Sequence, residues 1–228
     1  MLHLLPLLAL AALVLWLSLT DGRGTQAAEP HTGGISYTTS DSEGRPATFT
    51  LAHTPERVLV SYPGATELMI DLGLERRIIG TIAPYGKEPS AYADAYAELP
   101  ILAAPYVPSR EEVVALAPDL IIGWSHHFTP EALGDVYSYF DRGVGAYIVP
   151  ATVRRGAPTL EETVYPFIAD MGHIFDAEDC AADYIAALKA RVAAVEDRTA
   201  VRGKRFSAMI LQSHGNSLYS MYAPAYII

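Results

Sequence analysis

The 228-residue sequence predicts an α/β protein in which helices cover a parallel sheet. Two observations support this fold class. Between residues 57 and 150, short apolar runs alternate with stretches of helical periodicity. A long helical pattern at 159–200 then precedes one more apolar run at 203–213. We therefore expect one α/β lobe, a long bridging helix and the start of a second lobe.

The N-terminus carries an uncharged apolar run, Leu4–Thr20, followed by a short polar segment. Small residues at Thr25 and Ala27 suit cleavage after Ala27, so residues 1–27 are expected to be a signal peptide. No cysteine lies nearby, which argues against a lipoprotein anchor. Export to the periplasm or another extracytoplasmic space follows, with an uncleaved membrane anchor as the alternative.

The first folded elements are expected to be a hairpin and a strand–helix–strand unit. Residues 28–55 alternate polar and apolar side chains on both sides of the turn sequence "SDSEG". An apolar strand at 57–60 precedes a helix at 64–74, for which Gly73 is the expected C-cap, and a strand follows at 77–82.

The next elements complete a Rossmann-like lobe over residues 56–158. A Pro- and Tyr-rich loop with one short helix leads to Ser109, which forms a capping box with Glu112. The helix that starts there ends before Pro118. The remaining expected elements are a strand at 119–124, a helix that begins at Thr129 with Pro130 in its first turn, and a strand at 145–150.

Residues 159–200 are expected to form the bridging helix region, with Pro166 as a kink or a new start and a break near Asp176. The strand at 203–213 opens the segment 201–228. This segment is too short for a domain, so the sequence predicts an incomplete second α/β lobe in a C-terminally truncated chain.

Composition and motif content narrow the range of functions that the sequence predicts. The net charge is −10 and no basic block occurs, so nucleic-acid binding is not expected. Cys180 is the only cysteine, which rules out an intramolecular disulfide and a cysteine-based zinc site. No catalytic motif is present, neither Gly-x-Ser-x-Gly, nor His-Glu-x-x-His, nor a phosphate-binding glycine loop. We expect a monomeric binding protein without enzymatic activity or cofactor.

Two motifs carry a resemblance to a known family. They are "TPERVLVSYPGATELMIDLGLERRIIGTI" at 54–82 and "PSREEVVALAPDLIIGW" at 108–124. In this order the chain resembles the periplasmic binding proteins that serve ferric-siderophore, haem and vitamin B12 ABC importers, over about residues 35–213. The resemblance implies two lobes joined by a rigid helix. It also implies that an iron chelate, haem or cobalamin lies in the cleft between them and passes to a membrane permease.

The expected ligand-binding residues follow strands, where open α/β lobes bind their ligands. These segments are rich in Tyr, Trp and Pro, which suits a large ligand with flat faces. The resemblance implies ligand contacts for Trp124, five positions after Asp119, and for Tyr85 and Tyr106. It also implies that Glu111 docks on the permease; the alternative is that Glu111 or Glu112 is simply a favourable charge in the first helical turn. The full expected ligand set is Tyr62, Tyr85, Tyr106, Trp124, His126 and His127.

A divalent-metal (Zn²⁺ or Mn²⁺) binding protein of similar layout is the alternative. On an extended backbone, His126 and His127 would point in opposite directions and could not easily share one ion. One of them, with a carboxylate from elsewhere, remains a possible ligand. No residue is assigned to a metal site.

Overall fold

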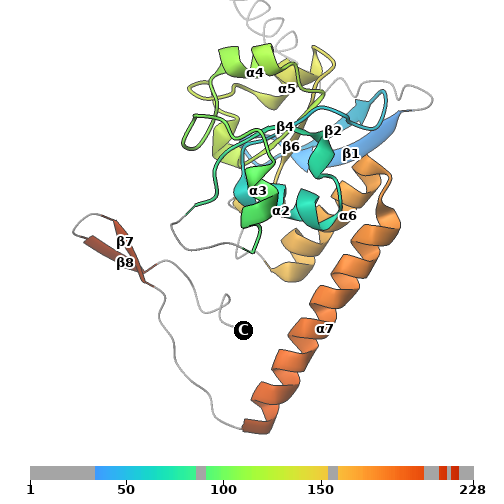
Figure 1. Cartoon of the computed structure of the whole chain (residues 1–228), viewed down its shortest axis with the longest axis vertical. Helices are drawn as coiled ribbons and strands as arrows, with labels where there is room; N and C mark the ends of the chain where they lie inside the picture. The colour runs from blue at the N-terminus through green and yellow to red at the C-terminus, as the bar shows by residue number, and fades with distance from the viewer. Residues whose placement is uncertain (1–33, 86–90, 154–158, 203–210, 215–216, 221–228) are drawn as a thin grey trace, which may run out of the picture. The chain divides into compact units, whose positions relative to one another are not determined.

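The computed structural model describes residues 34–85, 91–153, 159–202, 211–214 and 217–220 (Figure 1). The predicted signal peptide at 1–27 lies outside these residues, and so does most of the predicted strand at 203–213. Within the part of the chain that the structure describes, no helix is both long and apolar enough to cross a membrane.

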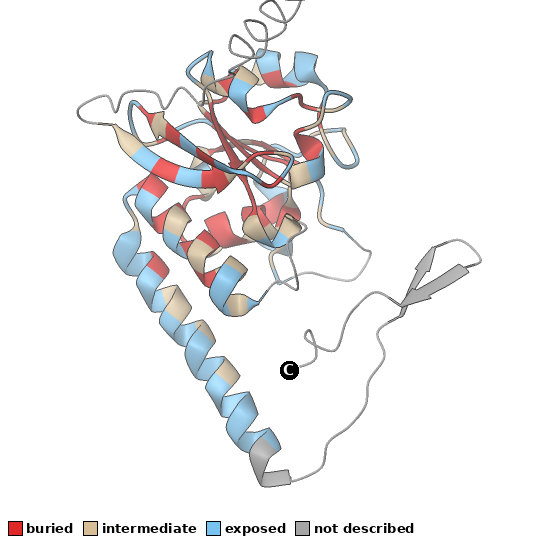
Figure 2. Cartoon of the chain, turned by 180° about the vertical axis from the view of Figure 1, so that it is seen from behind, coloured by how far each residue is buried: buried red, intermediate tan, exposed pale blue. Residues whose placement is uncertain are grey.

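The core is a four-stranded parallel sheet, as the sequence predicts. Its strands are β3 (Val58–Val60), β4 (Ile78–Thr81), β5 (Leu120–Gly123) and β6 (Gly145–Ile148), and their order is β4-β3-β5-β6. Almost every residue of these strands is buried, which explains why they appear in the sequence as unbroken apolar runs (Figure 2).

Helices and 3-10 turns flank the sheet; the helices predicted at 64–74, in the Pro- and Tyr-rich loop and from Ser109 are present, whereas the sequence does not predict the three 3-10 turns. They are α2 (Pro63–Asp71), η1 (Glu75–Arg77), α3 (Ala93–Ala97), α4 (Arg110–Leu116), η2 (Ser125–His127), α5 (Val136–Phe140) and η3 (Pro150–Thr152). The capping box of Ser109 and Glu112 at the start of α4 is present. The C-cap of α2 is Leu72, one position earlier than predicted, and Gly73 follows it with φ 71°.

A helix follows β5, but its predicted start at Thr129 is wrong. Residues 125–127 form a 3-10 turn, and α5 begins only after Asp135, whose carboxylate accepts the Tyr137 N–H at 2.8 Å. Arg110 accounts for the difference, because its guanidinium donates to the carbonyls of Ala132, at 2.9 Å, and of Pro130. In addition, Gly134 adopts φ 94°, which a helix cannot continue through.

The N-terminal hairpin protects one edge of the sheet. It consists of β1 (Ile35–Ser40) and β2 (Pro46–Leu51), which pair antiparallel. The Tyr37 hydroxyl donates to the Ala146 carbonyl of β6 at 3.0 Å, and the Ile148 N–H donates to Thr39 Oγ1 at 3.0 Å. Side-chain hydrogen bonds thus replace ladder bonds along the free side of β6.

The helical region after the sheet divides as predicted. It comprises η4 (Leu160–Val164), α6 (Tyr165–Phe175) and the 25-residue α7 (Glu178–Arg202). Pro166 lies in the first turn of α6, where its missing N–H does no harm, and the break falls at Asp176, which has φ 57°. Packing against α6 buries Ala181 near the start of α7, while much of the rest of α7 is exposed (Figure 2).

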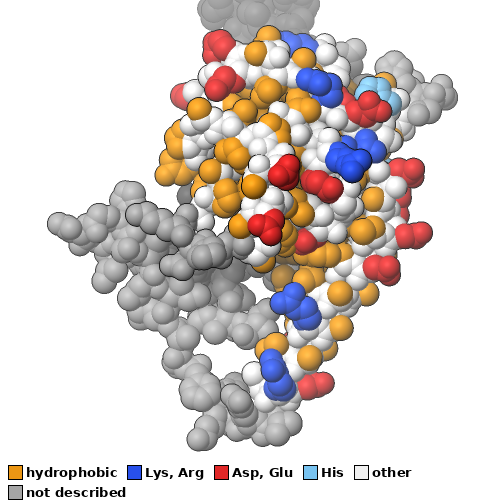
Figure 3. Space-filling model, viewed as in Figure 1, with side chains coloured by type: hydrophobic (Ala, Val, Ile, Leu, Met, Phe, Trp, Pro, Cys, Tyr) orange, Lys and Arg blue, Asp and Glu red, His pale blue; other side chains and the backbone are white. Residues whose placement is uncertain are grey.

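Asp71 connects α7 to the lobe. Its Oδ2 accepts hydrogen bonds from the Tyr92 hydroxyl at 2.8 Å and from the Tyr184 hydroxyl of α7 at 2.7 Å. Two short strands, β7 (Leu211–His214) and β8 (Ser217–Ser220), form a separate antiparallel pair. Acidic and basic side chains are intermixed over the face shown in Figure 3, with no basic cluster among the described residues there.

Candidate ligand-binding site

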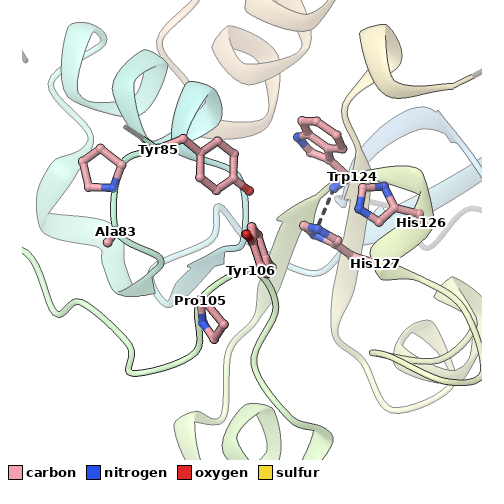
Figure 4. Close-up of a pocket in the computed structure, with 8 residues that line it drawn as sticks. Ala83, Tyr85, Pro105, Tyr106, Trp124, His126 and His127 are labelled. Carbon is pink, nitrogen blue, oxygen red and sulfur yellow. Dashed lines mark hydrogen bonds between the residues drawn. The ribbon is translucent and has the colours of Figure 1, made fainter. Parts of the chain in front are cut away.

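The carboxyl ends of the parallel strands surround a pocket of about 640 Å³, here called the aromatic pocket (Figure 4). Open α/β sheets bind ligands at this edge. The residues that line the pocket are Ala83, Pro84, Tyr85, Pro105, Tyr106, Trp124, His126 and His127. Five of the six predicted ligand residues are therefore brought together here, and the sixth, Tyr62, lies beside them.

Different segments deliver the aromatic rings. Tyr85 comes from the loop after β4, Tyr106 from the loop before α4, and Trp124 from the end of β5. The rings of Tyr85 and Tyr106 lie 6.1 Å apart, and Figure 4 shows both facing the space opposite Trp124. Tyr106 is 63% exposed, so its ring is available for contact. A flat or apolar ligand surface would be held between these rings.

Trp124 packs against three neighbouring rings. The rings of Tyr62 and His126 both make T-shaped contacts with the indole, with centroids 5.2 Å and 5.0 Å away. The ring of His127 lies nearly parallel to the indole at 6.2 Å. The buried indole Nε1–H has no hydrogen-bond partner among the described residues. An unpaired buried donor is unfavourable, so a ligand acceptor that reached it would gain a hydrogen bond.

Hydrogen bonds to His127 hold the backbone of Trp124 in place. It is buried, and its Nδ1 lies 2.9 Å from Ser61 Oγ and 3.4 Å from the backbone nitrogen of Trp124. A backbone N–H can only donate, so Nδ1 accepts and the ring proton resides on Nε2. This neutral tautomer holds the backbone of Trp124 and leaves Nε2–H as the ring's remaining donor.

The two histidines do not diverge as an extended backbone would require. They lie in the 3-10 turn η2, and their ring centroids are 4.5 Å apart. The geometric argument against a shared ion therefore does not apply to this segment. In the described part of the chain, however, no group of three or more His, Cys, Asp or Glu side chains is arranged to hold a metal.

A second pocket of about 630 Å³ shares Trp124 and His126 with the aromatic pocket. We call it the hairpin-turn pocket, because the turn between β1 and β2 forms one wall. Its lining residues are Ser42, Glu43, Gly44, Tyr62, Trp124, Ser125, His126, Thr129, Ala151, Thr152 and Val153. The sequence prediction contains only three of these residues, because it places the hairpin outside the lobe and assigns no role to the loop after β6.

Two hydrogen bonds connect the loops around the hairpin-turn pocket. The Ser125 N–H donates to Thr152 Oγ1 at 3.0 Å, and Ser125 Oγ donates to the Thr152 carbonyl at 2.8 Å. The Thr152 hydroxyl in turn donates to the Val149 carbonyl at 2.7 Å. These hydrogen bonds thus hold together the loops that follow β5 and β6, which both line the hairpin-turn pocket.

The two candidate docking carboxylates have different surroundings. The Glu112 carboxylate accepts the Ser109 N–H at 2.8 Å and so belongs to the cap of α4. Glu111 is exposed in the same helical turn and has no ion pair or hydrogen bond among the described residues. Only Glu111 therefore offers a carboxylate that is not engaged in the helix cap.

The environment of His127 predicts a specific pH dependence of stability. Burial, with a smaller effect of neighbouring His126, lowers the pKa of His127 from 6.5 to about 4. The unfolded chain therefore binds a proton more readily, and the stabilisation is complete above pH 6.5 and is lost as the pH falls through about 4. Between about pH 7 and pH 4.5, wild type should lose about 2 kcal/mol more unfolding free energy than His127→Asn.

Urea denaturation followed by circular dichroism measures this difference. The asparagine amide oxygen keeps an acceptor near the position of Nδ1 but does not titrate. The control is His53→Asn, which removes an exposed histidine and should give a curve parallel to that of wild type. A His127→Asn curve parallel to wild type would contradict the assignment of a buried neutral imidazole.

The comparisons of sequence and of structure with known proteins agree on one family. The sequence model of the periplasmic binding protein family matches residues 58–226. No curated protein matches the chain. A periplasmic binding protein from Veillonella parvula is similar in structure, with a TM-score of 0.72 and 25% identity, over 83% of this chain and 60% of that chain.

Two further solved structures are similar. An ABC-type Fe³⁺-hydroxamate transport protein from Saccharomonospora viridis has a TM-score of 0.57 and 25% identity, over 73% of this chain and 57% of that chain. The petrobactin-binding protein YclQ from Bacillus subtilis shares the fold, with a TM-score of 0.61 and 18% identity, over 83% of this chain and 61% of that chain. This chain thus spans less than two thirds of their length. Because the family match covers most of the sequence, the chain belongs to the periplasmic binding protein family.

Proposed function

We propose that this chain is the substrate-binding component of an ABC importer, which binds an iron chelate or a corrinoid outside the cytoplasm and delivers it to a membrane permease. The observation that carries the proposal is the aromatic pocket at the carboxyl edge of the sheet. Its volume of about 640 Å³ suits a ligand larger than a metal ion. The Fe³⁺-hydroxamate transport protein of Saccharomonospora viridis, similar at 25% identity, supports this ligand class.

The chemistry of the pocket supports binding of the ligand as a complex. Tyr85, Tyr106 and Trp124 offer ring faces for an organic ligand shell. Burial raises the pKa of Tyr85, so its hydroxyl remains a neutral donor at physiological pH. A chelate also surrounds its own metal and needs no protein ligands, in contrast to a bare Zn²⁺ or Mn²⁺ ion. Because His126 and His127 lie close together, a bare divalent metal ion is the alternative ligand to be tested.

Calorimetric titration tests the ligand class. We expect saturable binding of at least one member of a panel of ferrioxamine B, ferric enterobactin, haemin and cobalamin, and none of Zn²⁺ or Mn²⁺ alone. Tyr106→Ala should weaken binding about fivefold or more, because it removes one exposed face of the pocket. The control is Tyr137→Ala, which removes an exposed tyrosine of α5 outside both pockets.

Two results would contradict the proposal. If only Zn²⁺ or Mn²⁺ bound, the divalent-metal alternative would replace it. If no panel member bound, or if a chelate bound equally well to wild type and to Tyr106→Ala, the aromatic pocket would not be the site.

A substitution of Glu111, the proposed docking residue, should impair transport without changing ligand binding. Glu111→Ala should leave the chelate dissociation constant unchanged and reduce uptake of the ⁵⁵Fe-labelled chelate in cells that produce the chain with its permease. Glu112→Ala, the matched control, should lower the unfolding free energy by about 1 kcal/mol through loss of the cap and preserve uptake. Unchanged uptake by Glu111→Ala would exclude this carboxylate from docking.

A further inference from the structure

The segment between η2 and α5 adopts a conformation that its own sequence does not favour. Thr129 followed by Pro130 is a local signal for the start of a helix. Leu133, Val136 and Phe140 have the spacing of one apolar face of that helix. The chain nevertheless reaches α5 through a turn, and α5 begins only at Val136. A contact from outside the segment therefore has to outweigh the local signal.

The turn differs from a helix at two backbone positions. The Thr129 carbonyl accepts the N–H groups of Ala132 at 3.0 Å and of Gly134 at 2.8 Å. After these bonds the chain turns away, because Gly134 has φ 94° and Asp135 is extended, with ψ 142°. Glycine also adopts helical backbone angles. A change of backbone angles at Gly134 and Asp135 would thus join the turn to α5 as one continuous helix.

Arg110 occupies the carbonyls that the continuous helix needs. Its guanidinium donates to the Ala132 carbonyl at 2.9 Å through Nε and to the Pro130 carbonyl through Nη2. In an α-helix each carbonyl accepts from the N–H four residues later. The Pro130 carbonyl would therefore accept from Gly134, and the Ala132 carbonyl from Val136. Arg110 thus stabilises the turn by binding two acceptors of the competing helix.

The turn also supports the walls of both pockets. The Leu133 N–H donates to the His127 carbonyl at 2.9 Å, and Thr129 lines the hairpin-turn pocket. In a continuous helix the Leu133 N–H would donate to Thr129 instead, and the bond to His127 would be lost. His127 lines the aromatic pocket and accepts the backbone N–H of Trp124. The conformation of the turn therefore affects the position of His127, and through it that of Trp124.

The contact made by Arg110 lies at the surface, whereas the residues that it arranges are buried. Arg110 is exposed, so its guanidinium can return to water without leaving an unpaired charge in the interior. Leu133 and Val136 are 1% and 0% exposed and belong to the core. A substitution at Arg110 can therefore remove the contact without opening a cavity in the core.

We propose that Arg110 is a positioning residue of the candidate site. It holds residues 129–135 as a turn, against their tendency to continue α5 as a helix, and so keeps His127 and Trp124 in the walls of the pockets. Loss of the contact extends α5 toward Thr129 and displaces these walls. The inference rests on the proposed function only for the role of the pockets, because the change of conformation requires no ligand.

Nuclear magnetic resonance of the ¹³C,¹⁵N-labelled chain without added ligand tests the change of conformation. In Arg110→Gln, the ¹³Cα signals of residues 131–135 should move toward helical values. The Val136 N–H has no acceptor within α5, since it lies in the first turn. In a continuous helix it gains the Ala132 carbonyl, so its hydrogen exchange should slow about tenfold or more. Arg76→Gln, which replaces an exposed arginine of η1, is the matched control and should change neither signal.

The same spectra test the effect on the site. The indole Nε1–H signal of Trp124, assigned with Trp124→Phe, should shift in Arg110→Gln and stay unchanged in Arg76→Gln. Such a shift separates a positioning role from a general loss of stability, because it reports the surroundings of one ring that Arg110 does not contact.

A second pair of variants changes the turn and leaves Arg110 in place. A positive φ is unfavourable for alanine, whereas a helix favours alanine over glycine. Gly134→Ala should therefore produce the same helical ¹³Cα shifts and the same shift of the Trp124 indole signal. Its control is Gly134→Asn, because asparagine tolerates positive φ better than alanine does and should preserve the turn.

Three results would overturn the role of Arg110. The first is a turn that persists in Arg110→Gln. The second is a helical segment 131–135 with an unchanged Trp124 signal, which would show that the turn does not position the site. The third is global unfolding of both Arg110→Gln and Gly134→Ala, since only the segment before α5 is expected to change. Because no ligand is added, each of these results is independent of whether the chain binds a chelate.

Discussion

The hydrogen bonds between Ser61, His127 and the backbone of Trp124 fix the centre of the site. Ser61 follows β3 and Trp124 follows β5, so these bonds join the ends of two adjacent strands. Gly123 makes the arrangement possible, because a Cβ at this position would lie 2.5 Å from Ser61 Oγ. A buried neutral imidazole can accept from both neighbours here only while its Nδ1 is unprotonated. The orientation of Trp124, which both pockets share, depends on this condition.

Carboxylates hold the lobe around this centre. Asp119 accepts the backbone N–H groups of Glu56 at 2.7 Å and Arg57 at 3.0 Å, and Arg57 Nε donates to the Ala117 carbonyl at 2.9 Å. The Pro-Asp sequence before β5 thus ties the start of β3 to the end of α4. Asp41 fixes the hairpin turn in the same way. Each carboxylate accepts hydrogen bonds from backbone donors at the end of an element, and these bonds hold the strand ends in position.

Much of the fold could be predicted from the sequence because its signals are local. Buried parallel strands require apolar runs, and the start of α4 requires a residue such as Ser109 followed by Glu112. The segment after Thr129 could not be predicted in this way. Its carbonyls are bound by Arg110, and no local pattern reveals a partner about twenty residues earlier in the chain. A strong local helix signal was overridden by this tertiary contact.

The grouping of residues in the candidate site was predictable to a similar extent. Aromatic residues after strands indicate a pocket, since strand ends meet at one edge of a sheet. The burial of His127 was not predictable, because its partner Ser61 lies 66 residues earlier. The hairpin-turn pocket was missed for the same reason, since its walls come from residues 42–44 and 151–153. Of the two adjacent histidines, His127 is buried and His126 is exposed.

The protonation state of His127 tests this account most directly. Long-range ¹H–¹⁵N correlation spectra of the ¹⁵N-labelled chain, with His127→Asn to assign the signals, report which ring nitrogen carries the proton. The account predicts a neutral ring with the proton on Nε2 at neutral pH, and protonation only near pH 4. A proton on Nδ1, or an imidazolium at neutral pH, would contradict it, because Nδ1 could then not accept the Trp124 N–H.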